Sequence, residues 1–308
     1  MGNPPIVVAD RLCKSFGDQV AVDELSFEIH RGETIGLLGP NGAGKTTTIS
    51  MLVGLLRPDQ GNVVIGDASA DSEGNFGSPL RHEVRQLIGV APQTLSLYDE
   101  LSAKENLEFF GQLYGLSGTR LKERVQWALS FAELEDRQRG RLGTFSGGMK
   151  RRMNIAVALI HEPEILLLDE PTVGVDPQSR NHIFDSIRQL QAGGMTILYT
   201  THYMEQAQRL CDSVAIIDHG KLLAQDSVSR LIGKYGGSSV VTCELNGKPD
   251  QIELPGQLDG DSIRFESDRP LEQVAELTSR GVQFQTLSIA QPDLESVFLS
   301  LTGRSLRD

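Results

Sequence analysis

Gly39-Pro40-Asn41-Gly42-Ala43-Gly44-Lys45-Thr46 is the stretch that decides how this chain folds. It lies between an apolar run at 34–38, typical of a buried strand, and a helix-like segment at 47–52. Glycines let successive N–H groups turn inward and surround an anion. The N-terminus of the following helix adds partial positive charge, Lys45 can reach the β and γ phosphates, and the Thr46 hydroxyl suits Mg²⁺. The stretch therefore predicts a nucleoside triphosphate site.

The alternative is a glycine-rich turn that happens to precede a lysine. Two glycines, a lysine and a Ser or Thr at fixed offsets arise by chance in roughly 1–2% of chains of this length. The flanking strand and helix patterns make that coincidence rarer still, so we prefer the phosphate loop.

Length and charge limit the other possibilities. With 308 residues the chain can form one large and one small domain. It has 41 acidic against 29 basic residues, a formal charge of −12. This balance argues against an extended nucleic-acid surface, so we expect no nucleic-acid partner. Cysteines at 13, 211 and 243 lack CxxC spacing and are interpreted as reduced thiols of a cytoplasmic protein.

The chain offers no candidate for a membrane-spanning helix or a secretory signal. Its first five residues lack a basic region followed by an apolar stretch. The most apolar segment, 155–168, is interrupted by polar residues and falls short of the roughly 20 apolar residues that a span needs. We therefore expect the chain to stay inside the cell and to reach a membrane only through a partner.

The first part of the chain predicts strands around the phosphate loop. Residues 6–30 have the alternation of an antiparallel hairpin, and 62–65 and 87–91 read as further strands. An exposed loop is expected at 67–79, which is rich in Gly, Ser and Asp. Phe16 can stack on a nucleotide base or can belong to the core, and the sequence leaves both open.

A helical insertion follows the strand at 87–91. Ser102 and Glu105 match a capping box that opens a helix over 103–115, and residues 119–135 continue the helical pattern. We expect a helical subdomain at about 95–162.

Ser146-Gly147-Gly148 opens another helix that runs to about residue 160. Ser146 can cap this helix, and the two glycines leave N–H groups unobstructed, which favours a second anion site. An ordinary capped helix with a basic first turn at 150–152 explains the same residues.

Two carboxylates end the most apolar strand. Residues 165–168 are four large apolar residues, as in a central parallel strand, and Asp169 and Glu170 follow them. Asp169 suits Mg²⁺ and Glu170 suits polarising a water, because neighbouring strand residues point to opposite faces. The alternative is a strand that enters a charged loop.

One more strand ends in a histidine. A helix at 179–192 and a strand at 196–200 lead to His202, which fits a γ-phosphate contact or a histidine satisfied within the core. A helix at 204–211, a strand at 214–217 and a short helix at 227–235 complete the first domain, residues 1–235.

Residues 236–308 predict a small α+β domain without a catalytic set of its own. Its expected elements are strands at 240–243, 252–254, 263–265 and 282–287 and helices at 271–280 and 293–301.

These motifs together resemble an ABC ATP-binding cassette across residues 6–232. The phosphate loop, Gln93, the serine–glycine–glycine turn, the paired carboxylates and His202 stand in the order and spacing of that family. The resemblance implies an α/β P-loop NTPase fold with a mostly parallel core sheet, an antiparallel β-subdomain and a helical subdomain. The segment 292–304 resembles the ABC-2-type and daunorubicin-resistance exporter ATPases.

The resemblance also implies roles for residues. Glu170 would be the general base, His202 would brace the γ-phosphate, and Gln93 would join Thr46 and Asp169 at Mg²⁺ and water. Nucleotide contacts are implied for Phe16, Gly39, Pro40, Asn41, Gly42, Ala43, Gly44, Lys45, Thr46, Thr47, Ser146, Gly147, Gly148 and Asp176. Of these, Ser146 to Gly148 would bind ATP held by the opposite subunit, and Asp176 would lie in the loop facing that subunit.

One position departs from the family pattern. The usual Leu-Ser-Gly-Gly-Gln is Phe145-Ser146-Gly147-Gly148-Met149 here, and Met149 has no amide to offer. We expect activity to persist, since similar exporters tolerate Met at this place.

The resemblance implies an ATPase subunit that powers export through a separate ABC-2-type permease. Two cassettes would close on ATP at the cytoplasmic face of the membrane and reopen after hydrolysis, and the exported molecule would be a drug, a lipid or a polysaccharide-like compound. An importer ATPase is the alternative, followed by a cassette acting on ribosomes or DNA. A GTPase is disfavoured because no Asn-Lys-x-Asp motif is present.

Overall fold

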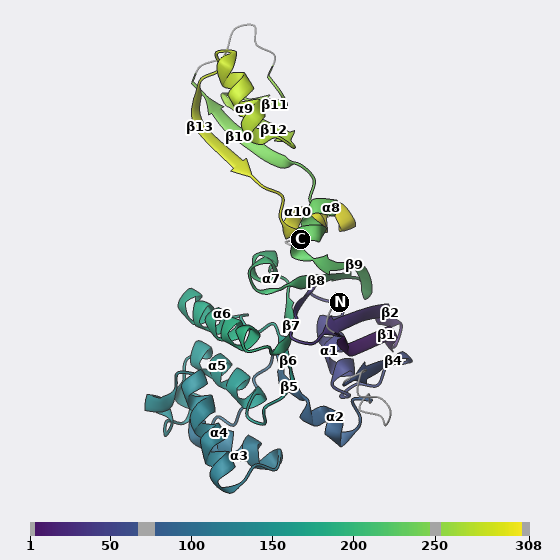
Figure 1. Ribbon diagram of the computed structural model, residues 1–308, viewed down its shortest axis with the longest axis vertical. Helices are drawn as coiled ribbons and strands as arrows, with labels where there is room; N and C mark the ends of the chain where they lie inside the picture. Colours follow the sequence, from purple (N-terminus) through teal and green to yellow (C-terminus); the bar gives the residue numbers. More distant parts are fainter. Residues whose placement is uncertain (1–3, 67–77, 247–253, 304–308) are drawn as a thin grey trace. The chain divides into compact units, whose positions relative to one another are not determined.

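The computed structural model describes residues 4–66, 78–246 and 254–303. The chain divides into two compact units, Met1–Ser227 and Val228–Asp308, whose elements are labelled in Figure 1. The first unit contains two sheets among its described residues and the second unit contains one, and each unit is described separately. Most of the loop expected at 67–79 lies outside the described residues.

A six-stranded sheet forms the centre of the first unit. Its strand order is β5 (Ile88–Ala91), β6 (Ile165–Asp169), β7 (Thr196–Thr201), β3 (Thr34–Leu38), β8 (Ser213–Asp218) and β9 (Lys221–Ser227). The first five strands are parallel, and β9 turns back antiparallel to β8. This arrangement confirms the expected parallel core.

Strand β6 is apolar throughout because both of its faces are buried. Ile165 and Leu167 belong to one hydrophobic core, whereas Leu166 and Leu168 belong to the core on the other face. A half-exposed strand would alternate apolar and polar residues, so the unbroken run at 165–168 follows from the central position of the strand.

The first core lies between the central sheet and a second, antiparallel sheet. That sheet has the order β2 (Gln19–His30), β1 (Pro5–Phe16) and β4 (Gln60–Ile65), which confirms the hairpin predicted from residues 6–30. Helix α1 (Lys45–Leu52) contributes Ile49, Met51 and Leu52 to the same core. The phosphate loop is thus anchored at both ends in buried structure.

Helices cover the other face of the central sheet. Residues of α5 (Gly147–Ala158), α6 (Pro177–Ala192) and α7 (Met204–Leu210) share a core with β6 and β7. Helices α3 (Ala103–Leu113) and α4 (Gly118–Phe131) pack with α5 and form a further hydrophobic core. We call α3, α4 and α5 the helical layer. Among the described residues, the unit also contains α2 (His82–Gln86) and 3-10 turns at Glu135–Arg137 and Leu142–Thr144.

The capping box predicted at the start of α3 is confirmed. The Glu105 backbone N–H donates to Ser102 Oγ over 3.2 Å, and the Ser102 N–H donates to Glu105 Oε2 over 2.8 Å. These bonds satisfy two donors at the helix start, which explains why the helix begins where the sequence indicated.

A partly buried histidine joins the helical layer to the sheet. The His161 ring stacks on Tyr114, at the end of α3, with 3.7 Å between ring centroids, and its Nε2 lies 3.1 Å from the Ile88 carbonyl of β5. Burial lowers the pKa of His161 to about 4. Arg124 of α4 donates to the carbonyls of Leu159 and Ile160 beside it.

The second unit is a four-stranded antiparallel sheet with helices. The strand order is β11 (Gln257–Asp259), β12 (Ser262–Ser267), β10 (Ser239–Leu245) and β13 (Phe284–Ala290). The helices are α8 (Val228–Tyr235), α9 (Pro270–Ser279) and α10 (Leu294–Thr302). Buried Val241, Cys243, Ile263, Phe265 and Leu277 form the centre of its core.

Two details differ from the expectations for this part of the chain, and a third expectation is not tested. Helix α8, which we had assigned to the first domain, packs against α10 and belongs to the second unit. The last strand covers 284–290 rather than 282–287, because Val282 is taken up by the core at the end of α9. Most of the strand expected at 252–254 lies outside the described residues.

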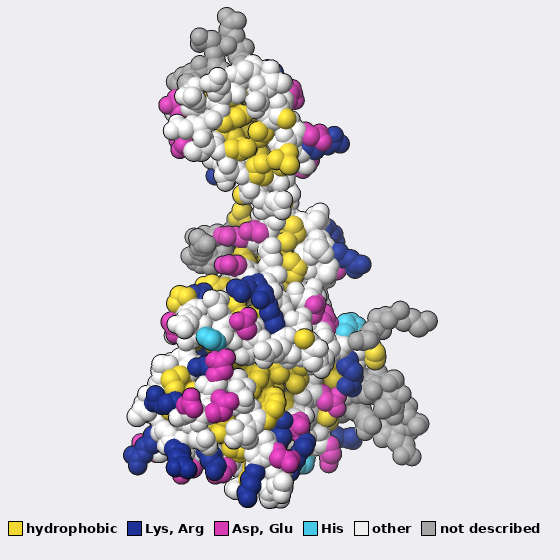
Figure 2. Space-filling view, turned by 60° about the vertical axis from the view of Figure 1, so that its left-hand side comes forward, with side chains coloured by type: hydrophobic (Ala, Val, Ile, Leu, Met, Phe, Trp, Pro, Cys, Tyr) yellow, Lys and Arg dark blue, Asp and Glu magenta, His cyan; other side chains and the backbone are white. Residues whose placement is uncertain are grey.

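The surface of the first unit mixes charges of both signs. Figure 2 shows Lys and Arg side chains interspersed with Asp and Glu on the face in view. Across the described residues, no helix is both long enough and apolar enough to cross a membrane.

Candidate active site

The phosphate loop is shaped by two glycines that cannot be replaced without a clash. Gly44 has φ +101°, a left-handed conformation that disfavours side chains, and a Cβ there would lie 2.4 Å from the Ala21 carbonyl oxygen. A Cβ on Gly39 would lie 2.4 Å from the Ile217 carbonyl oxygen. Between these two positions the loop runs through Pro40, Asn41, Gly42 and Ala43, and Lys45, Thr46 and Thr47 begin α1.

The Lys45 ammonium is buried at the loop. Its Nζ donates to the Gly39 carbonyl over 2.8 Å and to the Pro40 carbonyl over 3.0 Å. It also lies 3.1 Å from Glu170 Oε1, and both side chains are less than a tenth exposed. Because water screens buried charges poorly, this contact ties the phosphate loop electrostatically to the end of β6.

Glu170 is the meeting point of three predicted site residues. Besides Lys45, its carboxylate contacts Gln93 Nε2 at 3.3 Å and His202 Nδ1 at 3.3 Å. Gln93, Glu170 and His202 follow β5, β6 and β7, which are neighbours in the sheet (Figure 1). The carboxyl ends of parallel strands meet at one edge, so residues far apart in sequence form one cluster. We call Lys45, Gln93, Glu170 and His202 the Glu170 cluster.

Asp169 points to the other side of the strand end and contacts two hydroxyls. Thr46 Oγ1 donates to Asp169 Oδ2 over 2.9 Å, and Thr200 Oγ1 donates to Asp169 Oδ1 over 2.7 Å. The Glu170 backbone N–H in turn donates to Thr200 Oγ1 over 2.9 Å. Thr200 was not among the predicted residues, although a polar residue inside the apolar strand at 196–200 was a signal for it.

The donor atoms near Asp169 fit Mg²⁺. Within the described ranges, no group of three His, Cys, Asp or Glu side chains could hold a metal ion. Mg²⁺ commonly uses one or two carboxylates together with phosphate oxygens and water, and a Thr hydroxyl beside one carboxylate meets that need.

The backbone at Glu170 is strained. Its φ is +46°, a left-handed value that costs about 1–3 kcal/mol for a residue with a side chain. Such a conformation persists where the surroundings over-determine it, and such positions concentrate at functional sites.

The serine–glycine–glycine turn lies next to α6. Ser146 caps α5 by accepting from the Met149 N–H over 3.2 Å, while the Met149 side chain packs on the helical core. A Cβ on Gly148 would lie 2.2 Å from Ser179 Oγ. Ser179 belongs to the first turn of α6, which Asp176 caps.

The structure therefore brings Gly148 and Asp176 together. Asp176 Oδ1 accepts from the Ser179 N–H over 2.9 Å, and this backbone hydrogen bond lowers the pKa of Asp176. Among the described residues, no hydrogen bond or ion pair joins residues 146–148 to the Glu170 cluster.

Phe16 is not a core residue. It ends β1, its side chain is 52% exposed, and Lys14 Nζ lies 5.9 Å from its ring centroid. The ring is accessible for stacking, and its role remains a prediction.

Two further side chains of α5 hold the segment before Gln93. Arg151 Nη1 and Asn154 Nδ2 both donate to the Pro92 carbonyl, over 3.0 and 3.1 Å. Sequence reasoning treated Arg151 only as part of a basic triplet. Its burial gave no signal in the sequence, because the contact depends on the packing of α5 against β5.

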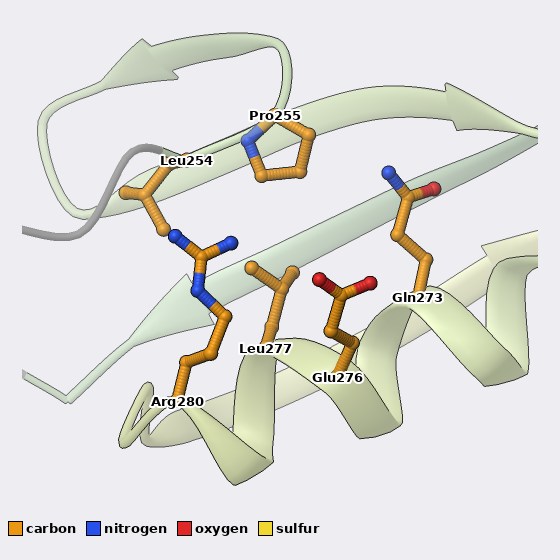
Figure 3. A pocket seen from close by; sticks show the side chains of 6 residues that line it. All are labelled: Leu254, Pro255, Gln273, Glu276, Leu277 and Arg280. Atoms are coloured by element: carbon orange, nitrogen blue, oxygen red, sulfur yellow. The ribbon is translucent and has the colours of Figure 1, made fainter.

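A cavity of about 250 Å³ lies in the second unit. It is lined by Leu254, Pro255, Gln273, Glu276, Leu277 and Arg280; Gln273, Glu276 and Leu277 belong to α9, and Arg280 directly follows that helix (Figure 3). Its lining includes one carboxylate and one guanidinium group and none of the predicted site residues.

Comparisons with known proteins identify the family of this chain. The sequence profile of the ABC transporter family matches residues 22–173. The linearmycin resistance ATP-binding protein of Bacillus subtilis (strain 168) is 40% identical, with 97% of this chain and 99% of the relative covered. The Nod factor export ATP-binding protein I of Ralstonia nicotianae is 39% identical over 100% of this chain and 97% of the relative.

Solved structures show the same fold. An ATP-binding subunit of an ABC transporter matches with TM-score 0.64 and 30% identity, over 75% of this chain and 93% of that one. A dimeric ATP-binding cassette in a post-hydrolysis state, bound to ADP and Pi, matches with TM-score 0.63 and 26% identity, over 72% and 98%. The chain belongs to the ABC transporter family and is one of its ATP-binding, ATP-hydrolysing subunits.

Proposed function

We propose that this chain hydrolyses ATP in a dimer of cassettes and thereby powers export through a separate membrane permease. The observation that carries the proposal is the Glu170 cluster, which places a carboxylate, an ammonium, an amide and an imidazole at one edge of the sheet. This set suits a hydrolysis in which charge develops on a phosphoryl group.

Each residue of the cluster has a distinct proposed role. Lys45 and the N–H groups of residues 39–47 bind the phosphates, and Phe16 stacks on the adenine. Glu170 accepts a proton from the attacking water, a step that typically contributes about 10²–10⁴-fold. Gln93 orients that water, and His202 braces the γ-phosphate.

Mg²⁺ would be held by Thr46, Asp169 and Gln93 together with the phosphates. When bound, it neutralises charge on the phosphate oxygens. Thr200 keeps Asp169 in place by donating to its second oxygen.

A second cassette would complete the site. Ser146 and Gly147 are exposed, and the bonds of residues 146–148 to their own chain leave the turn open to a partner. We propose that this turn binds the γ-phosphate of ATP held by the other cassette, with Asp176 beside it at the interface. The dimeric structure of a related cassette supports this arrangement.

Export is the direction we propose for transport. The relatives that are similar over nearly their whole length are named for linearmycin resistance and Nod factor export. We propose a lipid-like, drug-like or polysaccharide-like cargo, an ABC-2-type permease, and a place on the cytoplasmic face of the membrane through that permease. An importer would carry cargo the other way.

Mixing two inactive variants tests the shared site. Lys45→Ala should lose ATP binding, and Ser146→Arg should block the turn that serves the other chain. Each alone should hydrolyse almost no ATP. A mixed pair has one complete site, built from Lys45 of one chain and Ser146 of the other, so mixing should restore part of the wild-type phosphate release.

The outcomes separate the parts of the proposal. If wild type is active and no mixture recovers activity, the shared site is wrong. If wild type with Mg²⁺ and ATP releases no phosphate, the assigned activity is wrong. For direction, ATP-dependent accumulation of cargo in inside-out vesicles supports export, and accumulation only in right-side-out vesicles with internal ATP contradicts it.

A further inference from the structure

A buried group of hydroxyls beneath the Glu170 cluster has no part in the roles given above. Thr172 Oγ1 donates to Gln206 Oε1 over 2.9 Å, Tyr199 OH donates to it over 2.7 Å, and Thr201 Oγ1 over 3.3 Å. All four side chains belong to residues less than a tenth exposed. We call Thr172, Tyr199, Thr201 and Gln206 the hydroxyl cluster.

The hydroxyl cluster joins the two segments that carry Glu170 and His202. Thr172 lies two residues after Glu170, and Thr201 directly precedes His202. Gln206 lies on α7, so its side-chain oxygen bonds to both segments from a third element. One amide oxygen therefore links the segment after Glu170 to the residue before His202.

Thr201 also connects the cluster to the phosphate loop. Its carbonyl accepts from the Gly39 N–H over 3.3 Å, and its Oγ1 accepts from the Tyr203 N–H over 2.9 Å. The segment around His202 is thus held on both sides, by the loop and by α7.

The backbone strain at Glu170 indicates what the hydroxyl cluster does: it restrains the chain next to Glu170. A left-handed φ of +46° relaxes unless neighbouring contacts prevent it. The Glu170 N–H is held by Thr200 Oγ1, and the chain beyond it is held where Thr172 meets Gln206. Removing the amide oxygen would release one of these two restraints.

A polar cluster that only filled the core would be a poor choice for stability. Buried hydroxyls and amides are costly unless every partner is present, whereas apolar residues of similar size would pack without that requirement. Fully satisfied polar networks fix one geometry, which is what a reacting carboxylate and imidazole require.

We propose that Gln206 is a positioning residue for ATP hydrolysis: through Thr172 and Thr201 it sets the placement of Glu170 relative to His202. The proposal rests on the proposed function of Glu170 as base. Gln206 is not itself expected to contact nucleotide, so its loss should change turnover and leave ATP affinity intact.

The test compares three variants of the full-length chain with wild type. Gln206→Met keeps the side-chain size and removes the acceptor, whereas Gln206→Glu keeps an oxygen acceptor for the hydroxyls. Tyr199→Phe removes one donor and is the mildest change, and it serves if Gln206→Met fails to fold. Tyr114→Phe is the matched control, because it removes a partly buried tyrosine hydroxyl from the helical layer.

We expect Gln206→Met to lower kcat by roughly 10²-fold, the scale that a misplacement of about 1 Å can cause. Affinity for a fluorescent ATP analogue and KM should stay near wild type. Gln206→Glu should recover most of the lost kcat, Tyr199→Phe should lose less than Gln206→Met, and Tyr114→Phe should match wild type.

Three results would overturn the proposal. One is an unchanged kcat in folded Gln206→Met, or in Tyr199→Phe if the first variant does not fold. Another is an equal loss of kcat and of ATP affinity, and the third is a loss in Gln206→Glu as large as in Gln206→Met. Failure of the proposed function itself is distinguishable, since wild type would then release no phosphate and Glu170→Gln would match it.

Discussion

The Glu170 cluster and the turn at residues 146–148 satisfy their polar groups in opposite ways. Glu170 is 6% exposed, and its carboxylate contacts Lys45, Gln93 and His202 within one chain. Ser146 and Gly147 are exposed, and Ser146 Oγ bonds to the N–H of its own helix. The first region is held from several sides, and the second is open on one side.

A residue can be required for activity because of contacts within its own chain or because of contacts with a second chain, and the two regions differ in this respect. In the Glu170 cluster, the contacts that hold the side chains proposed for the chemistry all come from the same chain. In the turn, the fold of one chain constrains Gly148, which touches α6, but leaves space at Gly147, where the nearest atom to an added Cβ is the Gly174 carbonyl oxygen at 4.0 Å. A requirement for glycine at 147 would have to come from outside the chain.

The largest loss of ATP hydrolysis is expected from a substitution inside the Glu170 cluster. Glu170→Gln keeps the side-chain size but removes the proton acceptor, so phosphate release should fall by about 10²–10⁴-fold. ATP binding should remain, and the dimer should accumulate with ATP in size-exclusion light scattering. Glu164→Gln, an exposed position just before the same strand, is the control and should match wild type. Normal turnover in Glu170→Gln would remove Glu170 as the base.

A pair of alanine variants sharpens the comparison at the turn. Gly148→Ala should lower both activity and the melting temperature, because its Cβ meets Ser179 Oγ at 2.2 Å and overpacking typically costs about 1–3 kcal/mol. Gly147→Ala should keep or raise the melting temperature, since alanine favours a helix. Its phosphate release should still fall by roughly 10²-fold, since the methyl group displaces the partner's phosphate.

Thermal unfolding and phosphate release, measured on the same samples, decide this pair. Wild-type activity in Gly147→Ala would mean that no second cassette approaches this turn closely. Equal destabilisation of both variants would contradict the difference in space around the two glycines.

The smallest effect is expected on the stability of the fold, at the junction between the helical layer and the sheet. The turn belongs to the helical layer and the Glu170 cluster to the sheet, and His161 lies between the layer and the sheet. Burial lowers the pKa of His161 from 6.5 to about 4, so the unfolded chain binds a proton more readily than the folded chain. This contribution to stability is full above pH 6.5 and is lost as the pH falls toward 4.

Urea unfolding at two pH values measures this contribution. Between pH 7 and pH 5 the protonation of His161 should lower the free energy of unfolding by about 2 kcal/mol. His161→Phe should lack this part of the pH dependence, whereas His219→Phe, at an exposed histidine, should keep it. Equal slopes for the two variants would contradict the assignment.

Much of the fold was predictable because it depends on local patterns. The strand–loop–helix at 34–52, the capping box at Ser102 and the apolar run at 165–168 each occupy a few consecutive residues. The four residues of the Glu170 cluster were also predictable, since each follows a strand of one parallel sheet. Their mutual distances needed the strand order, which places β6 and β7 side by side.

Contacts between distant side chains were not predictable. Gln206 is an ordinary helix residue by its pattern, and its acceptor role appears only when α7 packs beside β7 and the turn after Glu170. The close approach of Gly148 to Ser179 likewise depends on how α5 and α6 pack. The assignment of α8 failed for a related reason, because its partner α10 lies at the other end of the second unit's sequence.

The position of β3 in the sheet has a consequence for how the chain folds during synthesis. Both neighbours of β3, β7 and β8, begin about 160 residues or more after it in the sequence. At roughly 5–20 residues per second, the ribosome needs about 9 to 36 s to reach the second of them. The helical layer from 103 to 158 can form earlier from contacts within itself, whereas the phosphate loop acquires its final shape only after Ile217 has emerged. Nucleotide binding therefore reports a late stage of folding of the first unit, and a ribosome-bound chain that stops before β8 should not retain ATP.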